Sequence, residues 1–230
     1  EVAARVLHRN EEEVLAALSG SLSREHRLLR AQSLHHVAQR RFSRYRFRHY
    51  LFQHYLYDGL DPVQRGQLHS QVAEALETLG AVNTSGPNWE STRELLVDIQ
   101  ERKPIAEGIV SLATMAWHWE QAGIAQKAAI YHFRACRKAE WSSASAYEEI
   151  LAHVKRAHSL FATLPQGPLR LRAESLCYEV WAGTVGGAVG WADPEVGRLF
   201  RMGLERAEAL GDPLLMAEML SVLGFREQFN

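Results

Sequence analysis

The stretch RRFSRYRFRHYLFQHYLY (residues 40–57) contains two sequence periods, and the change between them determines how the surrounding chain is interpreted. In FSRYRFRH (residues 42–49), arginines alternate with aromatic and histidine side chains, which is the period of a β-strand. One strand face carries Arg44, Arg46 and Arg48, and the other carries Tyr45, Phe47 and His49. From Tyr50 the period becomes helical, so we expect a strand that leads directly into a helix whose aromatic side chains face the core.

The residues before this stretch predict two short helices and a first strand. VAARVLH (residues 2–8) is helical, and Asn10 followed by three glutamates is a strong start signal for a second helix, EEEVLAALSGSL. HRLLRAQ (residues 26–32) is typical of a strand, and we expect the polar segment SLHHVAQRR (residues 33–41) to connect it to the next strand. Helix, helix and hairpin in this order predict a winged helix.

The residues after it predict helices only. Asp61-Pro62 interrupts the pattern, and a helix follows in which Pro62 suits the first turn and Gly80 the end. AVNTSGPNWESTR (residues 81–93) is polar and contains Gly-Pro, as in a loop between units. Further helices are expected over residues 105–121, 125–141, 146–164, 169–184, 194–210 and 213–225. GTVGGAVGWADPEV (residues 183–196) is interpreted as an inter-helix loop.

Small residues recur in these helices where paired helices must approach closely. The motifs Ala128-His132-Ala135, Ile150-Val154-Ala157 and Phe200-Leu204-Ala207 share offsets of four and then three, as in the second helix of a tetratricopeptide repeat. Their spacing is irregular, so the repeat is degenerate. The predicted fold class is mainly α, with a winged-helix-like domain over residues 1–80, a linker over residues 81–103, and tetratricopeptide-like helical repeats over residues 104–230.

Composition limits the classes of function. The chain has a formal net charge of −1, yet residues 24–57 contain eight arginines and one acid, so basic character is local. Cys136 and Cys177 are too far apart in the sequence for a zinc motif, and no apolar run is long enough to span a membrane. We therefore expect a cytoplasmic protein without a metal or a membrane contact, and the first residue, Glu1, suggests a piece of a longer protein.

The basic strand face has two interpretations. In the first, the arginines are a solvated surface above a packed aromatic face. In the second, Arg44, Arg46 and Arg48 contact nucleic acid, but the candidate recognition helix begins with Glu11, Glu12 and Glu13, which would repel phosphates. Nucleic acid is therefore the less favoured partner.

YRFRHYLFQHYLY (residues 45–57) resembles the end of the winged-helix domain of STAND NTPases, the signal-transduction class that includes plant immune receptors. In those receptors this segment carries a Met-His-Asp motif whose histidine contacts the β-phosphate of ADP. Here Arg48-His49-Tyr50 stands in its place, so only the histidine matches. The resemblance implies that His49 senses an ADP phosphate once an NTPase domain is present; an imidazole bound to a backbone carbonyl is the alternative.

The resemblance extends over most of the chain. Residues 44–79, WHWEQAGIAQKAAIYHFRACRKA (residues 117–139) and AYEEILAHVKRAHSLFATLP (residues 146–165) are similar to bacterial regulators in which an AAA-like ATPase precedes tetratricopeptide repeats. Such regulators often carry a nucleotide cyclase or a LuxR-type domain. The resemblance implies an upstream NTPase domain in the same polypeptide that binds ATP or ADP. This chain lacks a GxxxxGK[ST] loop, so we expect no cofactor and no enzyme activity in it alone.

Trp117 and Trp119 are candidate partner-binding residues, because two residues two positions apart cannot share one helix face and at least one should be exposed. Core packing is the alternative for both. The serines of WSSASAYEE lack a His-Asp arrangement that would activate a nucleophile. The favoured function is therefore regulatory: the winged helix relays nucleotide state, while the repeats bind a protein partner or self-associate. The alternative is a DNA-binding transcriptional regulator that uses the basic wing.

Overall fold

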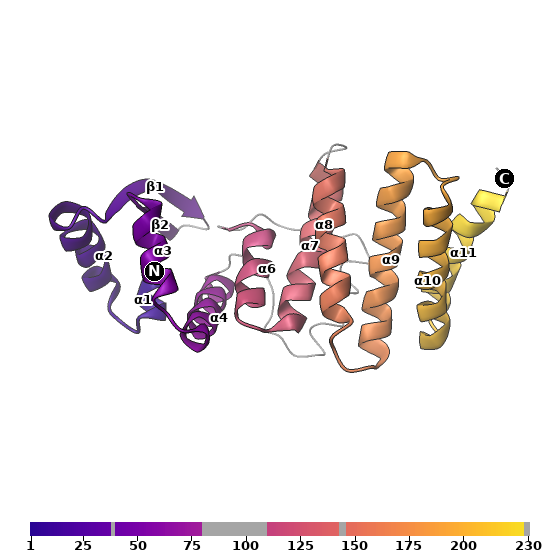
Figure 1. Cartoon of the computed structure of the whole chain (residues 1–230), viewed down its shortest axis with the longest axis horizontal. Coiled ribbons are helices and arrows are strands. Elements are labelled where there is room, and N and C mark those ends of the chain that lie inside the picture. Colours follow the sequence, from indigo (N-terminus) through magenta and orange to yellow (C-terminus); the bar gives the residue numbers. More distant parts are fainter. Residues whose placement is uncertain (38–39, 80–109, 143–145, 228–230) are drawn as a thin grey trace. The chain divides into compact units, whose positions relative to one another are not determined.

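The computed structural model describes residues 1–37, 40–79, 110–142 and 146–227. These residues are mainly helical, with one two-stranded antiparallel hairpin and an array of helices, which confirms the predicted fold class (Figure 1). They divide into two compact units: the first contains the hairpin and the helices up to α4, and the second contains almost all of α6 to α11. The predicted linker and Gly80 lie outside the described residues.

The first unit begins with α1 (Val2–Val6) and α2 (Glu11–Ser19), followed by a π-helical turn, η1 (Ser21–Glu25). The predicted cap of α2 is confirmed, because the Asn10 side chain accepts a hydrogen bond of 2.8 Å from the Glu12 amide. Such a cap satisfies one of the free amides at the start of a helix and contributes about 1 kcal/mol.

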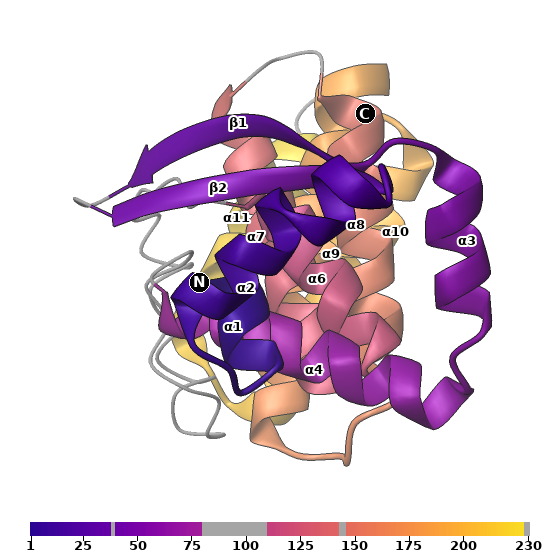
Figure 2. The same ribbon diagram turned by 90° about the vertical axis from the view of Figure 1, so that its left-hand side faces the viewer.

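The hairpin consists of β1 (Leu29–Val37) and β2 (Arg40–Phe47), which pair antiparallel from Leu29 opposite Phe47 to Val37 opposite Arg40 (Figure 2). The prediction that residues 33–41 form a connection was therefore wrong for residues 33–37, 40 and 41, which belong to the strands; residues 38 and 39 lie outside the described residues. Backbone pairing continues through this polar segment, because ladder hydrogen bonds satisfy the main chain whatever the side chains are. A register shift between Ala31 and Ser33 interrupts the ladder.

The helices α3 (Tyr50–Asp58) and α4 (Pro62–Thr78) complete the first unit. Asp61 and Gln64 form a capping box at the start of α4, with Pro62 in its first turn as predicted. Helix α4 packs on α1 and contributes buried side chains to the core of the unit: His69, Ala73, Ala75 and Leu76.

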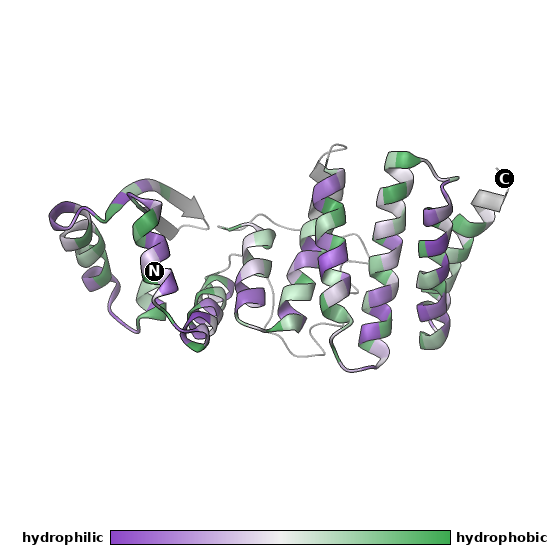
Figure 3. Cartoon of the chain, in the orientation of Figure 1, coloured by the Kyte–Doolittle hydropathy of each residue, from purple (hydrophilic) through white to green (hydrophobic). Residues whose placement is uncertain are grey.

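The second unit is a succession of helices in which each helix from α7 to α11 packs on the next (Figure 1). Their bounds are α6 (Leu112–Gln121), α7 (Ala125–Ser142), α8 (Tyr147–Phe161), α9 (Pro168–Val189), α10 (Pro194–Leu210) and α11 (Pro213–Glu227). Polar and apolar residues are interspersed along each helix (Figure 3), and the largest fully buried side chains include Trp119, Phe133 and Phe161. The predicted range of α10 is confirmed.

Small residues allow these helices to approach closely, as predicted. Ala128, Ala157 and Ala207 are fully buried. At Gly203 of α10, an added Cβ would lie 3.1 Å from Met219 Sδ and 3.3 Å from Tyr178 Cβ, so only glycine fits without movement.

The interpretation of residues 183–196 as a loop was wrong over its first half. Helix α9 continues to Val189, and only Gly190 to Asp193 separate it from α10. The ring of Trp191 packs so closely on Gly186 that an added Cβ would lie 3.0 Å from it. Tertiary packing therefore maintains a helix through glycines that disfavour one.

Candidate functional site

The faces of β2 have the predicted polarity. Arg44 and Arg46 are exposed, while Tyr45 and Phe47 on the opposite face are half-buried. Arg48 is also exposed, but it forms two hydrogen bonds to the start of the hairpin. Its amide donates to the Leu28 carbonyl at 2.9 Å, and its Nε donates to the Leu29 carbonyl at 3.0 Å. Arg48 therefore fixes the end of the hairpin, and Arg44 and Arg46 are the outward cations among the described side chains of β2.

His49 lies where β2 ends and α3 begins, and it is exposed rather than packed with Tyr45 and Phe47 as expected. It is the N-cap residue of α3, with extended backbone angles and no side-chain capping bond. Its ring makes an edge contact with Phe52 at 6.0 Å between centroids, and within the described part of the chain the imidazole makes no hydrogen bond. Both interpretations of His49, a contact with an ADP phosphate and a bond to a backbone carbonyl, therefore stay predictions; the described residues show an exposed imidazole.

Helix α3 has no buried residue, so the expectation that its aromatic side chains face the core was wrong. We use the name α3 surface for its exposed large apolar residues: Tyr50, Leu51, Phe52, Tyr55 and Leu56. Tyr55 is 80% exposed and Leu51 63%. Apolar side chains at such density on one short helix are unusual on a protein surface unless another surface covers them. The residues of the α3 surface and the adjacent His49 are therefore candidate interface residues.

Tyr57 anchors this helix to α4. Its hydroxyl lies 2.9 Å from Nε2 of the buried His69, and the Arg65 guanidinium stacks over its ring at 4.9 Å. Arg65 also donates to the carbonyls of Leu60 and Asp58, across the α3–α4 connection. One side of α3 is thus held in place while its apolar residues point away.

The two candidate tryptophans of α6 have opposite environments. Trp119 is fully buried, with Lys127 Nζ 3.5 Å from its ring centre, so it belongs to the core and is not accessible to a partner. Trp117 is 47% exposed and contacts the His118 ring. The expectation that they occupy different faces is confirmed, and only Trp117 remains a candidate contact.

Ionic groups between α9 and its neighbours are paired. The buried Glu174 carboxylate accepts from Arg170 Nε at 2.6 Å and from Arg206 Nε at 3.3 Å, and Arg172 pairs with Asp212. Because a buried carboxylate is stable only when its charge is compensated, these pairs maintain the packing of α9 on α10 and α11.

Sequence reasoning missed a polar chain that connects three helices of the second unit. Glu120 in α6 receives Arg156 of α8 at both carboxylate oxygens, with Arg156 Nε 3.1 Å from Glu120 Oε2. The same Oε2 lies 3.1 Å from Nε2 of His132 in α7, and His132 Nδ1 lies 2.9 Å from Nδ1 of His153 in α8. We name Glu120, His132 and His153 the histidine relay. Its members are far apart in sequence, so no local spacing reveals them.

Burial and charge set the protonation of the relay. The hydrogen bond from Arg156 lowers the pKa of Glu120, which is therefore a carboxylate at neutral pH. Burial lowers the pKa of both His132 and His153, against the opposing effects of Glu120 and Glu149. Within the described residues, no group of three or more His, Cys, Asp or Glu side chains could hold a metal ion.

Both cysteines are buried free thiols, and burial raises the pKa of Cys177 well above its usual value, which keeps it protonated. Among the described residues, none of the helices combines the length and apolarity needed to cross a bilayer.

The chain was compared with models of protein families, with curated protein sequences and with solved structures, and none of the three gave a match. The α3 surface, His49 and the helical array are therefore the features from which a function can be proposed.

Proposed function

We propose that this chain is the regulatory and interaction portion of a signal-transduction NTPase. Its first unit relays the nucleotide state of an NTPase domain in the same polypeptide, and its helical array binds a protein partner or a second copy. The observation that carries this proposal is the α3 surface, which exposes large apolar side chains on a helix with no buried residue.

The energetics favour a covered α3 surface. Full burial of a Leu or Phe side chain contributes about 1.5–3 kcal/mol. Leu51, Phe52 and Leu56 together therefore offer several kcal/mol to any surface that covers them, before the costs of association. A domain in the same polypeptide meets those costs most easily, because the linker raises its effective concentration.

The position of His49 favours a nucleotide as the ligand that the first unit senses. It is exposed at the uncapped N-terminus of α3, next to the α3 surface, so a domain that covers this surface also approaches the imidazole. The backbone amides of a helix N-terminus and a histidine N–H both donate to phosphate oxygens. This placement agrees with the role that the STAND resemblance implies for His49. ATP and ADP belong to the NTPase domain, and we assign no catalysis to this chain.

The second unit suits a partner-binding role. Arrays of antiparallel helical hairpins bury one side of each helix against the next and leave extended surfaces for ligands. Trp117 on α6 is the exposed aromatic residue that we assign to such a contact. We place the protein in the cytoplasm, where the thiols of Cys136 and Cys177 remain reduced.

The amount of ADP that the longer polypeptide retains tests whether the first unit transmits the nucleotide state. An upstream GxxxxGK[ST] loop is its first requirement, and its absence would exclude the proposal. With that domain present, His49→Ala should lower ADP retention by about tenfold, the effect of losing one charge-assisted hydrogen bond of roughly 1.5 kcal/mol. His54→Ala is the matched control, because His54 is an exposed histidine of the same helix, with its side chain 69% exposed. Equal ADP retention in the two variants would contradict the role of His49.

The DNA-binding alternative is favoured by the outward Arg44 and Arg46. If these contact phosphates, the affinity of the chain for duplex DNA should fall steeply with salt, with a slope of about −0.9 for each phosphate neutralised. The double variant Arg44→Gln/Arg46→Gln should then lose that dependence. We expect no salt-dependent binding, because Glu11, Glu12 and Glu13 are exposed at the start of α2.

A further inference from the structure

The hydrogen positions in the histidine relay follow from its partners. A carboxylate only accepts hydrogen bonds, so His132 Nε2 must carry a proton and donate to Glu120 Oε2 at 3.1 Å. Neutral His132 then has a lone pair on Nδ1. The Nδ1 of His153, 2.9 Å away, must therefore carry the proton and donate to it. Neutral His153 keeps its own lone pair on Nε2.

This order makes the relay sensitive to the number of protons that it holds. One added proton can bind at Nε2 of His153 and leave the Nδ1–H···Nδ1 bond intact. A second added proton must bind at Nδ1 of His132. Two N–H groups would then point at each other across 2.9 Å, and the link between α7 and α8 would be lost.

We propose that the histidine relay is a proton-sensitive clamp, which joins α6, α7 and α8 while both imidazoles are neutral and loses its α7–α8 bond when both are protonated. The bond between Arg156 and Glu120 still connects α8 to α6 after this loss. Acidification that protonates both imidazoles therefore loosens one hairpin of the array without dissolving the whole cluster.

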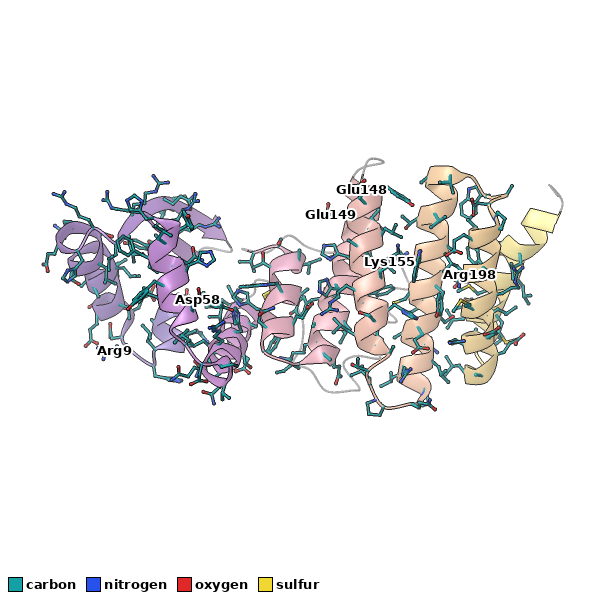
Figure 4. All side chains as sticks on the ribbon, viewed as in Figure 1. Arg9, Asp58, Glu148, Glu149, Lys155 and Arg198 are labelled. Atoms are coloured by element: carbon teal, nitrogen blue, oxygen red, sulfur yellow. The ribbon has the colours of Figure 1, made fainter. Side chains whose placement is uncertain are left out.

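The charges around the relay set the pH range. Glu120 of α6 and Glu149 of α8 favour protonation of the imidazoles, while Arg156 of α8 and the paired imidazole oppose it. Glu149 lies near the start of α8 (Figure 4). His158, also on α8, belongs to a separate environment formed by Glu174 and Arg170 of α9 and Arg206 of α10.

The sign of the pH effect follows from the direction of the shifts. Burial lowers the pKa of both relay histidines in the folded protein, so the unfolded chain binds protons first as the pH falls. The stabilisation by the neutral pair is complete above the ordinary histidine pKa of about 6.5 and decreases as the pH falls below it. The pKa of Glu120 is also lowered from 4.5, so the Arg156–Glu120 bond persists to a lower pH.

Two measurements on the complete chain test this clamp. Histidine nitrogen chemical shifts of the wild-type protein at pH 7.5 should identify His132 as the Nε2–H form and His153 as the Nδ1–H form. Either opposite tautomer would overturn the proposal, and this result needs no variant.

The second measurement is amide hydrogen exchange, corrected for the intrinsic pH effect, at pH 7.5 and pH 5.5. We expect the opening of α7 and α8 to increase at pH 5.5 by up to about tenfold for each relay imidazole, with α10 and α11 unchanged. His153→Asn places an amide donor near the Nδ1 position, does not titrate and has a similar helix propensity, so it should reduce this increase. His158→Asn is the control for the other half-buried histidine of α8 and should retain this increase. An equal pH response in wild type and His153→Asn would overturn the clamp.

Discussion

Helices α3 and α9 both carry tyrosines, yet these side chains lie in opposite environments. In α9, Tyr178 is 3% exposed, stacks against Trp181 and lies under the Arg206 guanidinium. In α3, Tyr55 is 80% exposed. Helix α9 packs on both α8 and α10, whereas α3 is held to α4 mainly by Tyr57, which contacts His69 and Arg65. Aromatic content alone therefore does not predict whether a helix stabilises its own chain or contacts another domain.

The largest difference is expected between two phenylalanine truncations, one in α3 and one in α10, which packs on α9. Phe200 of α10 is 2% exposed and packs with Tyr178 in the core of the second unit, so Phe200→Ala should lower the free energy of unfolding by about 3–5 kcal/mol. Phe52→Ala in α3 should change it by no more than about 0.5 kcal/mol, because Phe52 is 43% exposed. Urea unfolding of both variants checks this difference. Similar losses would mean that α3 is a structural helix of this chain.

A smaller effect on stability is expected from valine substitutions at two glycines, one buried between helices and one exposed. Gly203→Val would place its side chain against Met219 and Tyr178 and should cost about 1–3 kcal/mol through overpacking. Gly187 of α9 is exposed with no atom within 4 Å of an added Cβ, so Gly187→Val should stay within about 0.5 kcal/mol of wild type. Thermal melting of the pair measures the difference. A large loss at Gly187 would show that the outer side of α9 is packed as tightly as the inner side.

Local signals in the sequence were sufficient for much of the fold. Asn10 and Asp61 cap helices because an oxygen at that position satisfies free amides of the next turn, which needs no distant partner. Pro194 and Gly211 bracket α10 for equally local reasons, since Gly211 adopts a left-handed conformation at the helix end. The alternation in β2 likewise placed Arg44 and Tyr45 on opposite faces.

Features that depend on distant partners could not be predicted in this way. A helical period predicts that a helix has an apolar side, but not whether the same chain covers that side. The prediction that Tyr55 faces the core was wrong for this reason. The ring of Trp191 packs on Gly186 and stabilises the helical conformation of α9 there. Helix propensities do not include such a contact. The relay joins Glu120, His132 and His153 from three helices, and only the packing of those helices brings them together.

The proposed function requires that another domain of the same polypeptide covers the α3 surface. Hydrogen exchange at the α3 amides, measured in this chain and in the longer polypeptide with its NTPase domain and bound ADP, tests it most directly. We predict that α3 exchanges at least about tenfold more slowly in the longer polypeptide, because docking of Leu51, Phe52 and Leu56 stabilises the helix by several kcal/mol. The exchange of α10 should not change and serves as the internal reference. Equal exchange of α3 in the two proteins would contradict the proposal that an NTPase domain covers the α3 surface.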